Sequence, residues 1–207
     1  SKPFMAPNLR ARIKMLLTRL ERSRNCNPLT GLPGNIIIDE EIGKRLRQQE
    51  PLAVCYVNLV NFRAFHDYYG YVRGDIVIKL TARILIDAVK QHGGKRDFVG
   101  HIGGDDFIVL TDYHRHDKLC NCVIENFDNL VCYQYNEEDR DSGYIVSLDR
   151  RGVRQKYPIM AIAISVVTNR SRTLTSHAEI ADIAAPLMHF IKNNFTKSKV
   201  FEDRTSE

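Results

Sequence analysis

Two adjacent aspartates, Asp105 and Asp106, follow a pair of glycines in the segment HIGGDDFIVL, between two short apolar runs. Neighbouring carboxylates repel one another, so a cation or a chemical task is expected beside them. Asn58, near the end of the apolar run LAVCYVNLV, adds an amide oxygen. Mg²⁺ prefers oxygen ligands, and phosphoryl-transfer sites place it beside substrate phosphates. The two segments predict such a site if they are neighbours in the fold, whereas GGDD alone is more typical of an exposed β-turn.

The composition is that of a globular protein and excludes several other classes. The 207 residues, 43% hydrophobic and 27% charged, allow one domain with an appendage. No apolar run approaches the ~20 residues of a membrane span and no secretory leader is found, so we expect a cytoplasmic protein without direct membrane insertion. The net charge of +5 suits a nucleotide ligand or, equally, a solvated basic surface, and no nucleic-acid partner is predicted. Five cysteines, an odd number, favour reduced thiols.

Hydrophobic periodicity and turn residues predict the elements that position these side chains. We expect helices over residues 8–24, 36–46, 75–92, 116–135 and 176–195, the last one kinked or interrupted by Pro186. Strands are expected over residues 52–60, 97–102 and 107–112, and residues 143–167 should form two strands around a turn at Arg151 and Gly152. This order predicts an α+β fold of the ferredoxin-like, nucleotidyl-cyclase palm type, with helices flanking a mostly antiparallel central sheet.

Four segments together resemble one known family. GGDDF, at residues 103–107, resembles the signature of GGDEF domains, the diguanylate cyclases that join two GTP molecules into cyclic di-GMP. NPLTGLPGN (27–35), NLVNFRAFHDYYGYVRGD (58–75) and FIKNNFTKSKV (190–200) resemble three further motifs of that family, in the same order. The resemblance implies a GGDEF domain over residues 26–207, preceded by a connecting helix over residues 1–25.

The resemblance also implies roles for individual residues. Mg²⁺ or Mn²⁺ would be held, when nucleotide is bound, by Asn58, the carbonyl of Leu59, Asp105 and Asp106. Asp105 and Asp106 would also be the catalytic carboxylates. The nucleotide would be bound by Asn61, Phe62, Arg63, His66, Asp75, Gly103, Gly104 and Lys192. His66 and Asp75 would recognise the guanine, while Lys192 and backbone N–H groups at Asn61, Phe62 and Arg63 would bind phosphates.

Several of these positions depart from the family pattern. Asn58 replaces the usual Asp, which removes one negative charge beside the metal, and Asp106 replaces the usual Glu. Thr196 stands where the family has a second phosphate-binding residue, an Arg. Gly94 replaces the Arg of the R-x-x-D product-feedback motif that ends at Asp97, so that inhibitory site is expected to be absent.

Each candidate also has a structural interpretation. Asp75 suits a helix N-cap, and Lys192 suits the C-terminus of a helix. His66 and His101 are more typical of polar surface positions than of catalysis.

Three functions follow from the sequence. The first is a degenerate cyclase-like domain that binds GTP and regulates an attached sensor or phosphodiesterase-type domain, with weak or absent enzymatic activity. The second is an active diguanylate cyclase that works as a homodimer, because each of two facing domains must bring one GTP. The third is a nucleotide-free dimerisation or interaction module. The loss of a carboxylate at Asn58 favours the first.

Overall fold

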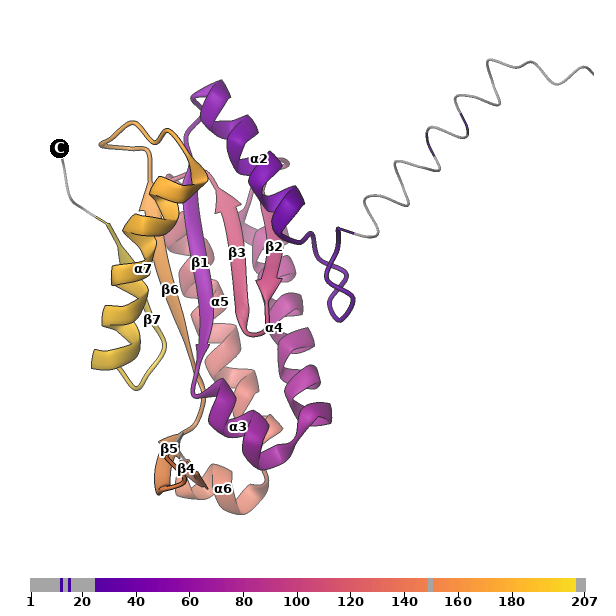
Figure 1. Cartoon of the computed structure of the whole chain (residues 1–207), viewed down its shortest axis with the longest axis vertical. Helices are drawn as coiled ribbons and strands as arrows, with labels where there is room; N and C mark the ends of the chain where they lie inside the picture. The colour runs from indigo at the N-terminus through magenta and orange to yellow at the C-terminus, as the bar shows by residue number, and fades with distance from the viewer. Residues whose placement is uncertain (1–11, 13–14, 16–24, 149–150, 204–207) are drawn as a thin grey trace, which may run out of the picture.

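The computed structural model describes Arg12, Met15, residues 25–148 and residues 151–203 (Figure 1). The helix expected over residues 8–24 lies almost entirely outside these residues. Within them, a mixed sheet has the strand order β2-β3-β1-β6-β7 and a separate two-stranded sheet joins β4 to β5. The strands are β1 (Ala53–Val60), β2 (Phe98–Gly103), β3 (Asp106–Thr111), β4 (Tyr144–Leu148), β5 (Arg154–Pro158), β6 (Ala161–Thr168) and β7 (Lys199–Glu202).

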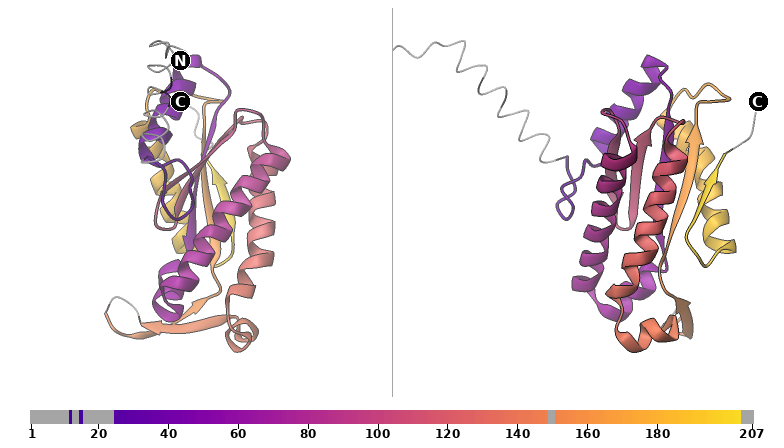
Figure 2. Two further views of the ribbon diagram at one scale, coloured as in Figure 1. Left: turned by 90° about the vertical axis from the view of Figure 1, so that its right-hand side faces the viewer. Right: turned by 180° about the vertical axis from the view of Figure 1, so that it is seen from behind.

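Helices cover both faces of the main sheet, as Figures 1 and 2 show. One face carries α4 (Tyr71–His92) and α5 (His116–Val131), and the other carries α2 (Asn35–Gln48) and α7 (His177–Asn194). The remaining helices are α3 (Phe62–Tyr69), η1 (Cys132–Gln134) and α6 (Glu137–Ser142). Within the main sheet every pairing is antiparallel except β6 with β7. The expected α+β fold with a mostly antiparallel sheet is confirmed.

The central strand β1 is apolar on both faces because both are covered by helices. Its residues Cys55 and Val57 pack with α4 and α5, while Val54 packs with α2 and α7. Side chains alternate along a strand, so Asn58 shares the α2 and α7 face with Val54. Beyond Asn58 on the same face, Val60 still packs with Ile191 of α7, and Asn58 itself is buried.

The structure corrects the expected start of the helix at Asp75. Helix α4 begins at Tyr71, directly after a separate helix α3 that the sequence analysis did not predict, and Gly70, with φ +84°, lies between them. Asp75 is therefore inside α4 and is not its N-cap. Gly74 does not break the helix, because its missing side chain makes room for the His66 ring, which would lie 2.6 Å from a Cβ at this position.

Residues 143–167 were expected to form two strands, but this region forms three, β4, β5 and β6. The backbone leaves the β4–β5 hairpin after Pro158, and the next two N–H groups bond outside any sheet, to Gly143 and to the Tyr135 hydroxyl. β6 then starts at Ala161 in the main sheet. The short strand β7 was not predicted.

Pro186 does not interrupt the last helix. It lies inside a single helix, α7, whose buried residues Ile180, Ala184 and Ile191 lie on both sides of it. Packing of these residues against the sheet outweighs the hydrogen bond that proline removes.

No disulfide joins the five cysteines, all of which lie among the described residues, and Cys55 and Cys120 are buried side by side with their sulfur atoms 3.9 Å apart. None of the helices among the described residues is long and apolar enough to cross a membrane.

Candidate functional site

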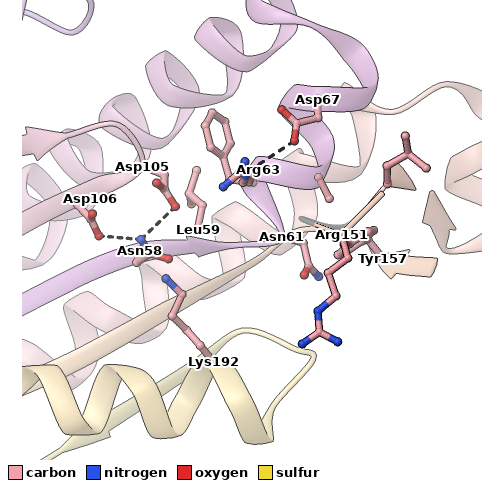
Figure 3. A pocket seen from close by; sticks show the side chains of 13 residues that line it. Asn58, Leu59, Asn61, Arg63, Asp67, Asp105, Asp106, Arg151, Tyr157 and Lys192 are labelled. Atoms are coloured by element: carbon pink, nitrogen blue, oxygen red, sulfur yellow. Dashed lines mark hydrogen bonds and ion pairs between the residues drawn. The ribbon is translucent and has the colours of Figure 1, made fainter. Parts of the chain in front are cut away.

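A pocket of about 630 Å³ opens beyond the end of β1 (Figure 3). Its walls come from β1, α3, the β2–β3 turn, the β4–β5 hairpin and α7. Eight of the predicted site residues line it: Asn58, Leu59, Asn61, Phe62, Arg63, Asp105, Asp106 and Lys192. The fold therefore brings together three of the four segments that the sequence analysis singled out.

The pairing of β1 with β3 sets the centre of the pocket. It places Asn58 directly opposite Asp106. The Asn58 side-chain amide donates hydrogen bonds to Asp106 Oδ1 at 2.7 Å and to Asp105 Oδ2 at 3.0 Å. The two carboxylates thus converge on the Asn58 Nδ2 atom, which holds them together without a charge of its own. The Asn58 Oδ1 atom is buried and has no hydrogen-bond partner among the residues that the structure describes.

Glycines shape the turn that presents these acids. Gly103 and Gly104 have φ values of +151° and +59°, in the region that side chains disfavour. His101 holds the turn, because its Nε2–H donates to the Gly104 carbonyl at 3.0 Å. Its Nδ1 then accepts from the Thr30 hydroxyl at 3.0 Å, which joins the segment 27–35 to the turn. His101 is only 2% exposed, so the expectation of a surface histidine was wrong.

The electrostatic environment of the acid pair is perturbed. Burial raises the pKa of the Asp105 carboxyl above its ordinary value, and the charge of Asp106 raises it further. The Lys192 ammonium and the Asn58 amide oppose this shift. A carboxyl group in a pocket whose pKa is raised by burial and by a neighbouring like charge is typical of functional sites.

The start of α3 offers backbone donors at the pocket. Asn61 is the N-cap in a left-handed conformation, with φ +65°, and its side chain does not cap the helix. Its amide instead donates to the Pro158 carbonyl at 3.3 Å. The first N–H groups of α3 have no partner within the helix, and such groups favour anions.

The side-chain oxygens at the centre of the pocket are the type of ligand that a hard divalent cation prefers. Their total negative charge is smaller than that of three carboxylates. Rotating the Asn58 amide would turn its orphaned Oδ1 toward the point where Asp105 and Asp106 converge, giving three side-chain oxygens. Asn58, Leu59, Asp105 and Asp106 are the residues that would hold the ion. No group of three His, Cys, Asp or Glu side chains suited to a metal occurs in the described part of the chain.

Four other predicted residues lie outside the pocket lining. Gly103 and Gly104 act through the turn. Asp75 is exposed on α4. His66 is on α3, and the centroid of its ring lies 4.4 Å from that of Tyr71 and 5.8 Å from that of Phe62. Since Phe62 does line the pocket, His66 lies directly behind one of its walls.

Gly94 and Asp97, at the positions where the feedback motif was expected to be absent, make other contacts. A Cβ at Gly94 would lie 2.1 Å from the guanidinium of Arg115. Asp97 accepts a hydrogen bond from the Thr111 hydroxyl at 2.6 Å. An arginine at position 94 would therefore require Arg115 to move.

The part of the pocket formed by the β4–β5 hairpin was not predicted from the sequence. Leu148, Arg151 and Tyr157 line the pocket from this side, and Asp67 and Ala64 complete the α3 wall. The sequence offered as a signal the basic residues around the turn predicted at Arg151 and Gly152.

Comparison with known proteins gives a consistent picture. The family model described as "Diguanylate cyclase, GGDEF domain" matches residues 25–139. Diguanylate cyclase DgcZ of Escherichia coli (strain K12) is 31% identical over 102 residues, 48% of this chain and 33% of that protein. Diguanylate cyclase DgcP of Pseudomonas aeruginosa is 32% identical over 88 residues, 41% of this chain and 12% of that protein. The chain thus matches a third or less of these relatives' length.

Solved structures share the fold at low sequence identity. The coiled coil and GGDEF domain of DgcB from Caulobacter crescentus, in complex with c-di-GMP, has a TM-score of 0.66 at 15% identity, with 95% of both chains covered. The S helix-GGDEF-EAL segment of Vibrio cholerae LapD, bound to c-di-GMP, has a TM-score of 0.67 at 14% identity, with 96% of this chain and 42% of that chain covered.

Proposed function

Because the chain belongs to the diguanylate cyclase GGDEF domain family, we propose that it acts in cyclic di-GMP signalling as a cyclase-like domain that binds GTP. Binding would require Mg²⁺ or Mn²⁺, turnover would be weak or absent, and the nucleotide-bound state would regulate an attached sensor or phosphodiesterase-type domain. The observation that carries this proposal is the hydrogen-bonded arrangement in which one neutral amide, that of Asn58, bridges Asp105 and Asp106.

That amide weakens the metal site in two ways. An Asp in its place would add one negative charge a few ångströms from the ion, which at an effective dielectric constant near 20 is worth on the order of several kcal/mol. The ion must also displace two hydrogen bonds that satisfy the carboxylates. Since each ~1.4 kcal/mol of lost transition-state stabilisation slows a reaction about tenfold, binding can survive a change that stops catalysis.

The remaining residues support nucleotide binding. Lys192 and the N–H groups of Asn61, Phe62 and Arg63 would bind the phosphates, and His66 and Asp75 would contact the guanine beyond the Phe62 wall. A bound metal would neutralise phosphate charge and polarise the reacting phosphate. Asp105 and Asp106 would hold that ion and accept the proton of an attacking hydroxyl if turnover occurs.

Calorimetric titration of the full chain with GTP, with and without Mg²⁺, tests the binding. Saturable binding that strengthens with Mg²⁺ is expected, with ATP as the control for base selectivity. Absence of binding to either nucleotide would contradict the proposal and leave a nucleotide-free dimerisation or interaction module.

A second candidate function is an active diguanylate cyclase. The convergence of Asp105 and Asp106 on a single point favours it, because two carboxylates and a backbone oxygen are a minimal set for Mg²⁺. Incubation with GTP and Mg²⁺ or Mn²⁺, followed by chromatography for cyclic di-GMP and pyrophosphate, separates it from the first candidate. Because the reaction needs two facing domains, its rate per protein should rise with protein concentration.

A further inference from the structure

The β4–β5 hairpin brings a cation of its own to the pocket. We propose that Arg151 of this hairpin binds the terminal phosphates of the nucleotide, an inference that rests on the GTP-binding function proposed above. Arg151 lines the same pocket as Lys192 and Asp105, although it is far from both in sequence. Figure 3 shows the acid pair at one end of the pocket and Arg151 at the other, with Asn61 between them.

The base of the hairpin is attached to the pocket wall. The Asn61 side chain donates to the Pro158 carbonyl, which joins the end of β5 to the start of α3. The following residues Ile159 and Met160 donate backbone N–H groups to the Gly143 carbonyl at 3.1 Å and to the Tyr135 hydroxyl at 2.9 Å. These bonds hold the base of the hairpin at the edge of the pocket.

The lining residues carry charges of both signs. Asp67, Asp105 and Asp106 are acidic, whereas Arg63, Arg151 and Lys192 are basic, and Arg63 forms an ion pair with Asp67 at 3.6 Å. Helix α7 lines the pocket with one cation, Lys192, and the position resembling the family's second phosphate-binding residue is Thr196. A metal-bound triphosphate is still anionic, and a guanidinium binds phosphate oxygens in a bidentate way that Lys192 does not.

The order of residues along the pocket assigns the phosphate. The acid pair marks the end where a metal and the reacting phosphate would lie, and the start of α3 comes next. Arg151 lies beyond Asn61, so it would meet the last phosphates and not the nucleoside. Arg151 should therefore increase affinity for GTP and GDP and have no effect on GMP.

The test compares two hairpin arginines in the full chain. Arg151→Ala should weaken Mg²⁺-GTP binding about tenfold or more, the size expected for a hydrogen-bonded contact to a charged group, and should leave GMP binding unchanged. Arg154→Ala is the matched control, because Arg154 begins β5 on the same hairpin and lines a neighbouring pocket. It should bind GTP as the wild type does. Arg151→Lys should recover part of the lost affinity.

The outcomes distinguish this inference from the proposed function. Equal GTP affinity in Arg151→Ala and wild type would overturn the role of Arg151 while leaving GTP binding intact. An equal loss in Arg154→Ala would also overturn it, because the hairpin would then act only through its overall charge. Weakened GMP binding in Arg151→Ala would indicate a displaced hairpin and likewise contradict a phosphate contact. A wild type that binds no GTP would overturn the proposed function itself.

Discussion

Asn58 and Asp106 are directly opposite one another in the β1–β3 pairing, and the Asn58 amide donates a 2.7 Å hydrogen bond to the Asp106 carboxylate. The same nitrogen donates to Asp105 at 3.0 Å. Strand pairing and a glycine turn hold these two carboxylates together, and the Asn58 amide and the Lys192 ammonium offset their repulsion. The amide therefore allows the site to exist in a stable form without a metal ion.

Replacing Asn58 by Asp should reverse this balance. Without metal, Asn58→Asp loses two charge-assisted hydrogen bonds and gains a third like charge, so we expect unfolding to become easier by about 1–3 kcal/mol. With Mg²⁺ the added carboxylate becomes a ligand, so the ion should restore the stability of the variant. The Mg²⁺-bound variant should then bind GTP more tightly than the wild type does. Thermal unfolding with and without Mg²⁺, and calorimetry with GTP, measure both effects.

The neutral variant Asn58→Ser is the control for this substitution. It removes the amide without adding charge, so Mg²⁺ should rescue it less than Asn58→Asp. If GTP affinity and its dependence on Mg²⁺ were the same in Asn58→Asp and the wild type, Asn58 would not be at the metal position.

The raised pKa of Asp105 predicts a pH dependence of stability. Because the folded state holds this proton more tightly than the unfolded state, stability should fall as the pH rises from the ordinary Asp pKa, near 3.8, through the raised value. Asp105→Asn should remove that part of the decline and stabilise the protein at pH 7 by about 0.5–2 kcal/mol, while abolishing the effect of Mg²⁺ on GTP binding. Urea unfolding at a series of pH values checks it, and identical pH profiles for variant and wild type would contradict it.

Lys192 should act on both the nucleotide and the acid pair. Its charge lowers the pKa of Asp105, so Lys192→Gln should raise that pKa further and extend the stability decline to higher pH. The same variant should weaken GTP binding, because a cation at the phosphates is lost. Lys197→Gln, an exposed lysine five residues along, is the control and should change neither property. Equal effects of the two variants would indicate only a loss of net charge.

The sequence was sufficient for the fold class because its apolar runs are strong. The segment of β1 is nearly continuously apolar and could be placed in the centre of a sheet from its composition alone. The acid turn was also predictable, since two glycines before Asp105 leave few other conformations.

What failed to follow from the sequence depends on tertiary contacts. His101 looked like a surface residue, yet it is buried because the Thr30 hydroxyl and the Gly104 carbonyl satisfy both ring nitrogens. The helix was expected to start at Asp75, yet Gly74 lies inside α4, where the His66 ring occupies the space of a side chain. The hairpin wall of the pocket could not be derived, because its position depends on contacts between residues far apart in the sequence, such as Asn61 with Pro158 and Tyr135 with Met160. The roles of Asp75 and His66 remain predictions from resemblance.

Gly100 should be intolerant of any side chain. A Cβ at this position would lie 2.6–2.7 Å from Ile38 of α2 and 2.9 Å from Ile108 of β3. Gly100→Ala should therefore destabilise the protein by about 1–3 kcal/mol, since overpacking at a buried contact forces the helix away from the sheet. Gly43→Ala is the matched control, because this helical glycine faces only the end of the Arg47 side chain and alanine favours helix. Calorimetry should show a lower Tm for the first variant and an unchanged or higher Tm for the second.

His101 should make the acid turn sensitive to pH. Burial lowers the pKa of the His101 imidazole, against the opposing effect of Asp105 and Asp106, so the folded state disfavours a proton that the unfolded state accepts near pH 6.5. By linkage, this residue should reduce stability as the pH falls through 6.5 toward 5. Protonation of Nδ1 would also remove the acceptor of the Thr30 hydroxyl hydrogen bond, and Mg²⁺-dependent GTP affinity should weaken over the same range. His101→Gln should be less stable than the wild type at pH 7.5 by about 1–3 kcal/mol, because it loses the bonds to Thr30 and Gly104, but it should lose less stability between pH 7.5 and 5.5. His114→Gln, at an exposed position, should follow the wild-type profile. If the wild-type and His101→Gln profiles were parallel, the imidazole would not be the group that couples this turn to pH.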